Sequence, residues 1–110
     1  MHAHPRDLKS NTAARLMSIA AIRARLSMLS VAYSARIGAV NMNDVHATVD
    51  RITSVFGQDH ELSREMLAFV AGLPELRRHV PDLAAAGDRL IRAVERTTWP
   101  DDAGRADIHG

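Results

Sequence analysis

The chain has 110 residues, of which 46% are hydrophobic, 25% are charged and only 4% are aromatic. This length provides for one domain with a single small core. The absence of cysteine excludes a disulfide scaffold and any thiolate metal site or nucleophile. Few aromatic residues, together with many Ala, Leu and Arg, favour helices over strands, so we expect an all-α fold.

The formal net charge of +1 is unevenly distributed along the chain. Residues 1–41 contain six basic residues and one acidic residue, whereas residues 42–110 contain eight basic and twelve acidic residues. We therefore expect the basic first part to face the acidic remainder, or a second copy of it. A nucleic-acid-binding surface more often combines a basic patch with several aromatic residues. Only Tyr33 accompanies these arginines, so no nucleic-acid partner is expected.

Residues 1–11 are polar and rich in His, and we expect them to form a flexible arm. Asn11 or Thr12 is a suitable N-cap for a long helix. This helix is predicted to run to about Ile37, because Gly38 can adopt the left-handed conformation that ends a helix. A helix of about 25 residues spans roughly 38 Å, which is long for so small a domain.

A second helix is predicted to begin at Asn43 and to end at Gly57. Its inward positions at helical spacing are Val45, Val49, Ile52 and Phe56. Asp59 or Ser63 can cap a third helix, which Pro74 is expected to stop.

A fourth helix is predicted after a short helical turn over residues 75–79. Pro81 suits its first turn, and it is expected to end near Thr98. Its inward residues are Leu83, Leu90, Ile91 and Val94. Residues 100–110 are expected to be a flexible tail, which leaves one small four-helix domain over residues 12–99.

The long first helix carries two apolar seams on roughly opposite faces when its residues are placed at 100° intervals. The first, here called the leucine–isoleucine seam, consists of Ile19, Ile22, Leu26, Leu29, Tyr33 and Ile37. The second, here called the alanine–methionine seam, consists of Met17, Ala20, Ala24, Met28, Val31 and Ala35. Three short helices could cover one seam but hardly both, and small or flexible side chains let another helix approach closely. We therefore expect the alanine–methionine seam to be the interface of a helical homodimer.

The first helix has other interpretations. A membrane span is not expected, because Arg23 and Arg25 would lie near the centre of the bilayer. An acid-free amphipathic segment rich in Arg and Ser is also typical of a transit peptide. Residues 1–41 could accordingly be a targeting segment or an upstream extension, with Met42 as an alternative start. The alanine–methionine seam could also be ordinary Ala-rich helix surface.

No residue pattern predicts catalytic residues, a cofactor or a metal site. His46 and Asp50 share a helical face, but a transition metal usually needs three or four ligands. The sequence Asp-His-Glu over residues 59–61 lies at a helix start, where the helix dipole favours acids, and no nucleophile accompanies it. The Arg-Arg-His cluster over residues 77–79 is typical of solvated surface.

The apolar arc of the third helix is wider than a single narrow seam. Part of it must be core, but Met, Phe and Leu at helical spacing also serve as anchors for a partner's groove. The candidate partner-binding residues are Leu62, Met66, Phe69, Val70 and Leu73.

These features favour a non-enzymatic cytoplasmic regulatory protein that sequesters another protein by occlusion. A cysteine-free, all-helical chain of this size, with one long bifacial helix and short capped partners, resembles the small antiactivators of proteobacterial quorum sensing, the QslA and TraM kind. The resemblance covers residues 12–98 at the level of architecture and shares no motif. It implies binding to a LuxR-type transcription factor through that factor's dimerisation or ligand-domain surface.

Two alternatives stay open. One is a dimeric secretion chaperone or small structural subunit, which would have an extended groove for an unfolded segment. The other is a small helical enzyme with an arginine-lined pocket between subunits, formed by Arg23 or Arg25 and recognisable by a buried acid that faces those arginines.

Overall fold

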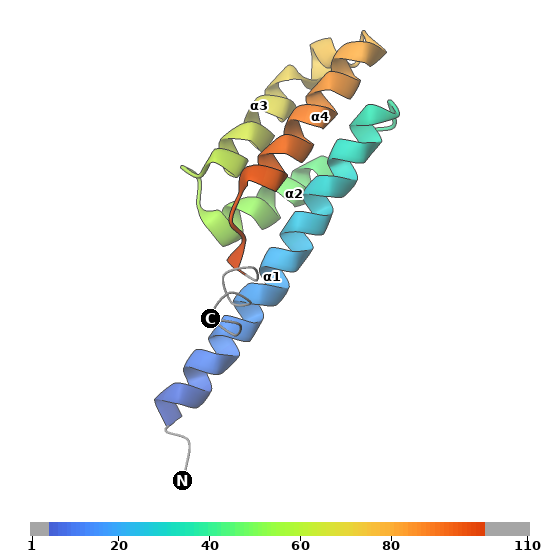
Figure 1. The fold of residues 1–110 in the computed structure, drawn as a ribbon. Coiled ribbons are helices and arrows are strands. Elements are labelled where there is room, and N and C mark those ends of the chain that lie inside the picture. The colour runs from blue at the N-terminus through green and yellow to red at the C-terminus, as the bar shows by residue number, and fades with distance from the viewer. Residues whose placement is uncertain (1–4, 101–110) are drawn as a thin grey trace.

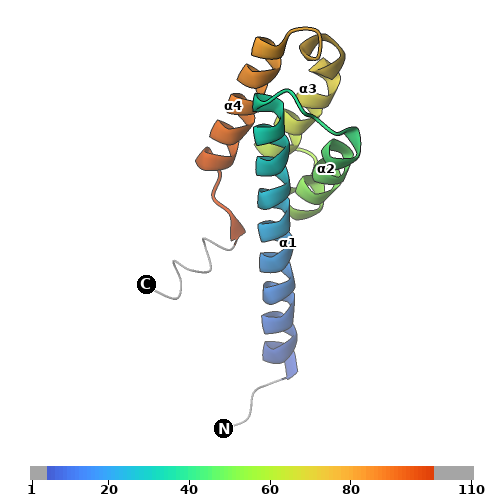
Figure 2. The ribbon, with the colours of Figure 1, turned by 90° about the vertical axis from the view of Figure 1, so that its right-hand side faces the viewer.

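The computed structural model describes residues 5–100, and describes side chains from residue 12 onward. It contains four helices, α1 (Pro5–Arg36), α2 (Met42–Phe56), α3 (Glu61–Leu76) and α4 (Val80–Arg96), with no strand in this part of the chain. Helix α1 packs against α2 and α4, and α3 packs against the same two helices. Figure 1 and Figure 2 show that the N-terminal part of α1 projects beyond the other three helices. The predicted all-α, four-helix architecture with one long first helix is confirmed.

Helix α1 begins at Pro5, so the predicted N-cap at Asn11 or Thr12 is wrong. Proline is well placed in the first turn of a helix, because backbone N–H groups in that turn have no partner within the helix and proline has no N–H. The residues that follow include good helix formers and no glycine or further proline. Residues 5–11 of the predicted arm are therefore helical, whereas residues 1–4 of that arm, and residues 101–110 of the predicted tail, lie outside the described residues.

The end of α1 is the one predicted. Gly38 has a φ of +74°, which is the left-handed conformation expected for a residue just beyond a helix. Its N–H donates to the carbonyl of Ala35 at 3.1 Å, and the N–H of Ala39 donates to the carbonyl of Ser34 at 2.9 Å. This pair of bonds is the Schellman motif, which satisfies carbonyls at the end of the helix.

The N-caps of α2 and α3 differ from those predicted. The side chain of Asn41 caps α2, because its Oδ1 accepts the backbone N–H of Asn43 at 2.8 Å. His60 caps α3, because its Nδ1 accepts the backbone N–H of Leu62 at 3.1 Å. Ser63, one of the predicted caps, is buried and donates its hydroxyl to the carbonyl of Gly57 at 2.5 Å.

Pro74 does not stop α3, which continues to Leu76 and takes in part of the separate turn predicted over residues 75–79. A proline in the last turn costs the helix only one nearby hydrogen bond, so the chain can complete the turn around it. The N–H of Arg77 then donates to the carbonyl of Leu73 at 2.9 Å.

The core lies between α1 and the layer formed by the shorter helices. Helix α4 approaches α1 very closely at Gly87, where an added Cβ would lie 2.4 Å from the carbonyl oxygen of Ala32 and 3.0 Å from the Cβ of Ala35. The inward residues predicted for α4 are mostly confirmed, since Leu83, Leu90 and Val94 are buried and Ile91 is half-buried. Small side chains on both helices permit this contact between their backbones.

Trp99, the only tryptophan of the chain, completes the core beyond the end of α4. Its indole N–H donates to the carbonyl of Val94 at 3.1 Å, and its ring meets the edge of Phe56 with centroids 5.1 Å apart. The guanidinium of Arg25 lies 5.6 Å from the centroid of the ring. Trp99 was not among the predicted core residues, although a large aromatic ring usually packs in a core.

Candidate functional site

The alanine–methionine seam, predicted as a dimer interface, lies largely in the core of the chain itself. Four of its six side chains are at most 2% exposed, namely Ala24, Met28, Val31 and Ala35. Met17 is 45% exposed and Ala20 is half-buried near the projecting end of the helix. Most of this seam is therefore closed to an outside partner in this fold, because the close approach that small side chains permit is used by the chain's own helices.

The leucine–isoleucine seam is the face of α1 that remains exposed. Ile19, Ile22, Leu26 and Tyr33 are 48%, 44%, 62% and 51% exposed, and Leu29 is half-buried. Leu16, on the projecting part of the helix, is a further large apolar residue in contact with solvent. A contiguous apolar stripe of this kind on a folded chain is typical of an interaction site.

The seam has a regular spacing. Its members at positions 19, 22, 26, 29 and 33 follow one another at intervals of three, four, three and four residues. This alternation is the repeat by which one helix packs along another in a coiled coil. The seam therefore has a geometry that fits a second helix, in addition to being apolar.

Arginines border this seam, and no acid occurs anywhere from position 8 to position 43. Arg36 is engaged within the chain, where its Nε lies 3.2 Å from Oδ1 of Asp88. Arg25 packs over Trp99. Arg15 and Arg23 make no ion pair with a described residue, so their charges face the surroundings of the seam.

A shallow groove of about 470 Å³ runs between α1 and α2 beside the seam, and Leu26 and Arg23 form part of its lining. Its other lining residues are Ser27, Ser30, Asp44, Ala47 and Arg51. The hydroxyl of Ser27 lies 2.6 Å from that of the buried Thr48 and accepts a hydrogen bond from Arg51 at 3.1 Å. The groove can accept side chains that extend past the seam.

The arginines of the enzyme alternative do not share one pocket. Arg23 lines this open groove together with Asp44 and also lines a neighbouring pocket that contains Asp50. Both acids are exposed, whereas Arg25 packs on Trp99. The buried acid by which an active site could be recognised does not face either arginine among the described residues.

The residues of α3 predicted to bind a partner belong to the core. Leu62, Met66, Phe69 and Leu73 are at most 4% exposed, and Val70 is half-buried. Their apolar arc is wide because α3 packs against both α2 and α4. In this fold a partner does not reach them, so the prediction that they form a docking surface is wrong.

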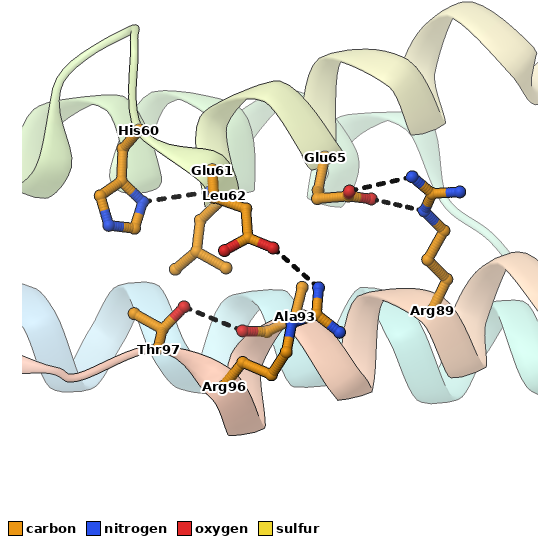
Figure 3. A network of polar contacts seen from close by, with 8 residues as sticks. All are labelled: His60, Glu61, Leu62, Glu65, Arg89, Ala93, Arg96 and Thr97. Carbon is orange, nitrogen blue, oxygen red and sulfur yellow. Dashed lines mark hydrogen bonds and ion pairs between the residues drawn. The ribbon is translucent and has the colours of Figure 1, made fainter.

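Two ion pairs join α3 to α4 above that core (Figure 3). Glu65 accepts two hydrogen bonds from Arg89, at 2.8 and 3.1 Å, and Arg96 donates to Glu61 at 2.7 Å. The hydrogen bond from Arg89 lowers the pKa of Glu65, against the opposing effect of burial. The same contact raises the pKa of Arg89. These pairs link the two helices.

The clusters that could suggest chemistry are occupied by structural contacts. His60 caps α3 and stacks on Phe56 with ring centroids 4.3 Å apart, and Glu61 is paired with Arg96. Within residues 12–100, no three His, Asp or Glu side chains are grouped so that they could hold a metal ion.

One stretch in the described part of the chain, Thr12–Arg36 of α1, is long and apolar enough to cross a membrane by length and composition, with a mean hydropathy of 1.3. Helices in the cores of soluble proteins and signal sequences meet the same criterion. In this fold 28% of the 18-residue window that meets the criterion is buried.

Comparison with known proteins gives no match, whether with protein families, with curated relatives or with solved structures. The exposed seam of α1 is therefore the feature of the chain that points to a function.

Proposed function

We propose that this chain is a non-enzymatic protein-binding domain that captures another protein with the leucine–isoleucine seam of α1. The supporting observation is that Ile19, Ile22, Leu26 and Tyr33 stay between 44% and 62% exposed while the opposite face of the same helix is buried. Folded chains seldom leave such a stripe in water unless a partner covers it.

The energy available from this seam is moderate. Burying an Ile or Leu side chain completely contributes about 1.5–3 kcal/mol. Four side chains that are each about half exposed would contribute roughly 3–6 kcal/mol, from which the cost of association is subtracted. A stable complex therefore also needs the groove between α1 and α2, which lies beside Leu26.

Capture of this kind would act by occlusion. A partner helix that packs along the seam has its apolar face covered. If that face belongs to the partner's dimerisation surface or to its ligand domain, the partner can no longer use it. A LuxR-type transcription factor, the class implied by the resemblance to quorum-sensing antiactivators, is the first candidate partner. The homodimer predicted from the sequence was placed on the opposite seam, and a dimer that used the leucine–isoleucine seam instead would compete with this partner. The secretion-chaperone alternative stays a prediction.

The experiment compares two exposed leucines on different faces. Leu26 lies in the seam and is 62% exposed, whereas Leu67 lies on α3 and is 48% exposed. Purified chain is titrated into a labelled LuxR-type regulator from the same cells, and binding is followed by fluorescence anisotropy and by loss of the regulator's DNA binding. We expect L26E to abolish both signals and L67E to preserve them, while Trp99 fluorescence shows that both variants are folded.

The result that contradicts the proposal is equal binding by L26E and the unmodified chain. If no LuxR-type regulator binds, that partner class is wrong. The seam itself is then tested with the peptides described below.

A further inference from the structure

We infer that the partner presents to the seam an amphipathic helix whose flanks carry acidic residues. This inference rests on the proposed function and adds the chemistry of the partner. It is carried by two observations on α1, the coiled-coil spacing of the seam and the uniform sign of the charges beside it.

The spacing assigns a place to each flanking residue. If Ile19, Leu26 and Tyr33 occupy the first apolar position of each heptad, Ile22 and Leu29 occupy the second. The positions that flank such a seam choose the partner by charge.

The flanking charges are all positive. Arg23 and Arg25 occupy two of the flanking positions, and the exposed Arg15 precedes the seam by one helical turn. Because Arg25 is engaged with Trp99, Arg15 and Arg23 are the cations that can pair with a partner. Carboxylates on the facing helix would complement both of them.

A second copy of α1 is a poorer match. In a pair of α1 helices both members would carry Arg15 and Arg23, and neither helix has an acid between positions 8 and 36 to pair with them. Like charges facing each other across a helix pair destabilise it, so the arginines act against self-association.

An anionic membrane surface matches the arginines but not their neighbours. The side of α1 that faces α2 is bordered by the exposed carboxylates Asp44 and Asp50. A flat anionic surface would meet these acids together with Arg23. A single partner helix is narrow enough for its carboxylates to contact the arginines without facing Asp44 and Asp50.

Two designed peptides of about three heptads test the inference with the full chain. Both carry Leu and Ile at the seam positions, and they differ only in having Glu or Lys at the flanking positions. With fluorescein-labelled peptides and anisotropy as the readout, we expect the Glu peptide to bind about tenfold more tightly than the Lys peptide at low salt. Added NaCl should reduce this difference.

Charge reversal provides the decisive variant. The double substitution R15E and R23E should reverse the preference, so that the Lys peptide binds more tightly. The matched control is R64E with R92E, which changes the net charge equally at exposed positions on α3 and α4. This control should keep the preference for the Glu peptide, and L26E should abolish the binding of both peptides.

Several results would overturn the inference. Equal binding of both peptides, unaffected by R15E and R23E, would leave the seam as a protein-binding surface but exclude an acidic partner. Sedimentation showing a dimer that L26E dissociates would assign the seam to a second copy. Tighter binding to phosphatidylglycerol vesicles than to either peptide would assign it to a membrane. Failure of both peptides to bind would overturn the proposed function as well.

Discussion

The inner face of α1 carries Ala24, Met28 and Ala32, whereas its outer face carries Ile22 and Leu26. The inner residues are completely buried, and the two outer ones are 44% and 62% exposed. The larger and more hydrophobic side chains are thus the ones left in water. The more hydrophobic face of α1 is therefore not the buried one. The buried face is the one that another helix backbone can approach most closely, because packing contacts strengthen as helices come closer.

The largest test of this difference truncates one residue on each face. M28A removes a fully buried side chain and leaves a cavity, so it should lower the free energy of unfolding by about 2–5 kcal/mol. L26A removes an exposed side chain and should change the free energy by less than about 0.5 kcal/mol. Urea unfolding followed by Trp99 fluorescence measures both. Similar losses for the two variants would mean that the outer face is also packed within one chain.

The close contact between α1 and α4 can be tested at a glycine. G87A places a Cβ 2.4 Å from the carbonyl oxygen of Ala32, so the helices must separate, and we expect a loss of about 1–3 kcal/mol. Gly72 is the matched control on α3, because an added Cβ would meet only the flexible Leu76 side chain at 3.4 Å. G72A should be stabilising by about 0.5–1 kcal/mol, since alanine favours helix. Thermal unfolding followed by circular dichroism gives the sign of each change, and stabilisation by G87A would contradict the close approach.

The cap of α3 should have a smaller effect. H60A removes the Nδ1 acceptor of the Leu62 N–H and should cost about 1 kcal/mol. H60N keeps a capping acceptor but loses the ring that stacks on Phe56, so it should recover much of the loss. Urea unfolding of both variants at neutral pH separates the cap from the ring, and equal losses would show that the stacking alone matters.

The smallest expected effect concerns the ion pair between α3 and α4. The hydrogen bond from Arg89 lowers the pKa of Glu65 below its ordinary value of 4.5. The carboxylate therefore stabilises the fold fully above pH 4.5, and this contribution is lost as the pH falls through the lower pKa of the folded state. E65Q should reduce stability at neutral pH and flatten its dependence on pH below 4.5. An unchanged acid profile would show that other carboxylates account for it.

Much of the fold could be predicted because its signals are local. The four helices, the end of α1 at Gly38 and the inward residues of α4 follow from periodicity and from backbone preferences that act within a few residues. The caps at Asn41 and His60 were misplaced because several polar residues near each start could serve, and the geometry of the incoming chain selects among them. The predicted end of α3 at Pro74 was wrong for a related reason. The destabilisation that a proline causes in a helix depends on how many helical residues follow it, and here only two do.

The sequence by itself determined that α1 has two apolar faces and that its flanking charges are basic, because both depend only on residue spacing and identity. Only the tertiary structure decided which face is outside. Gly87 on α4 lies opposite Ala32 and Ala35 of α1, a match between residues more than fifty positions apart that no local pattern contains. This contact turned the alanine–methionine seam inward and left Ile19, Ile22, Leu26 and Tyr33 exposed to solvent.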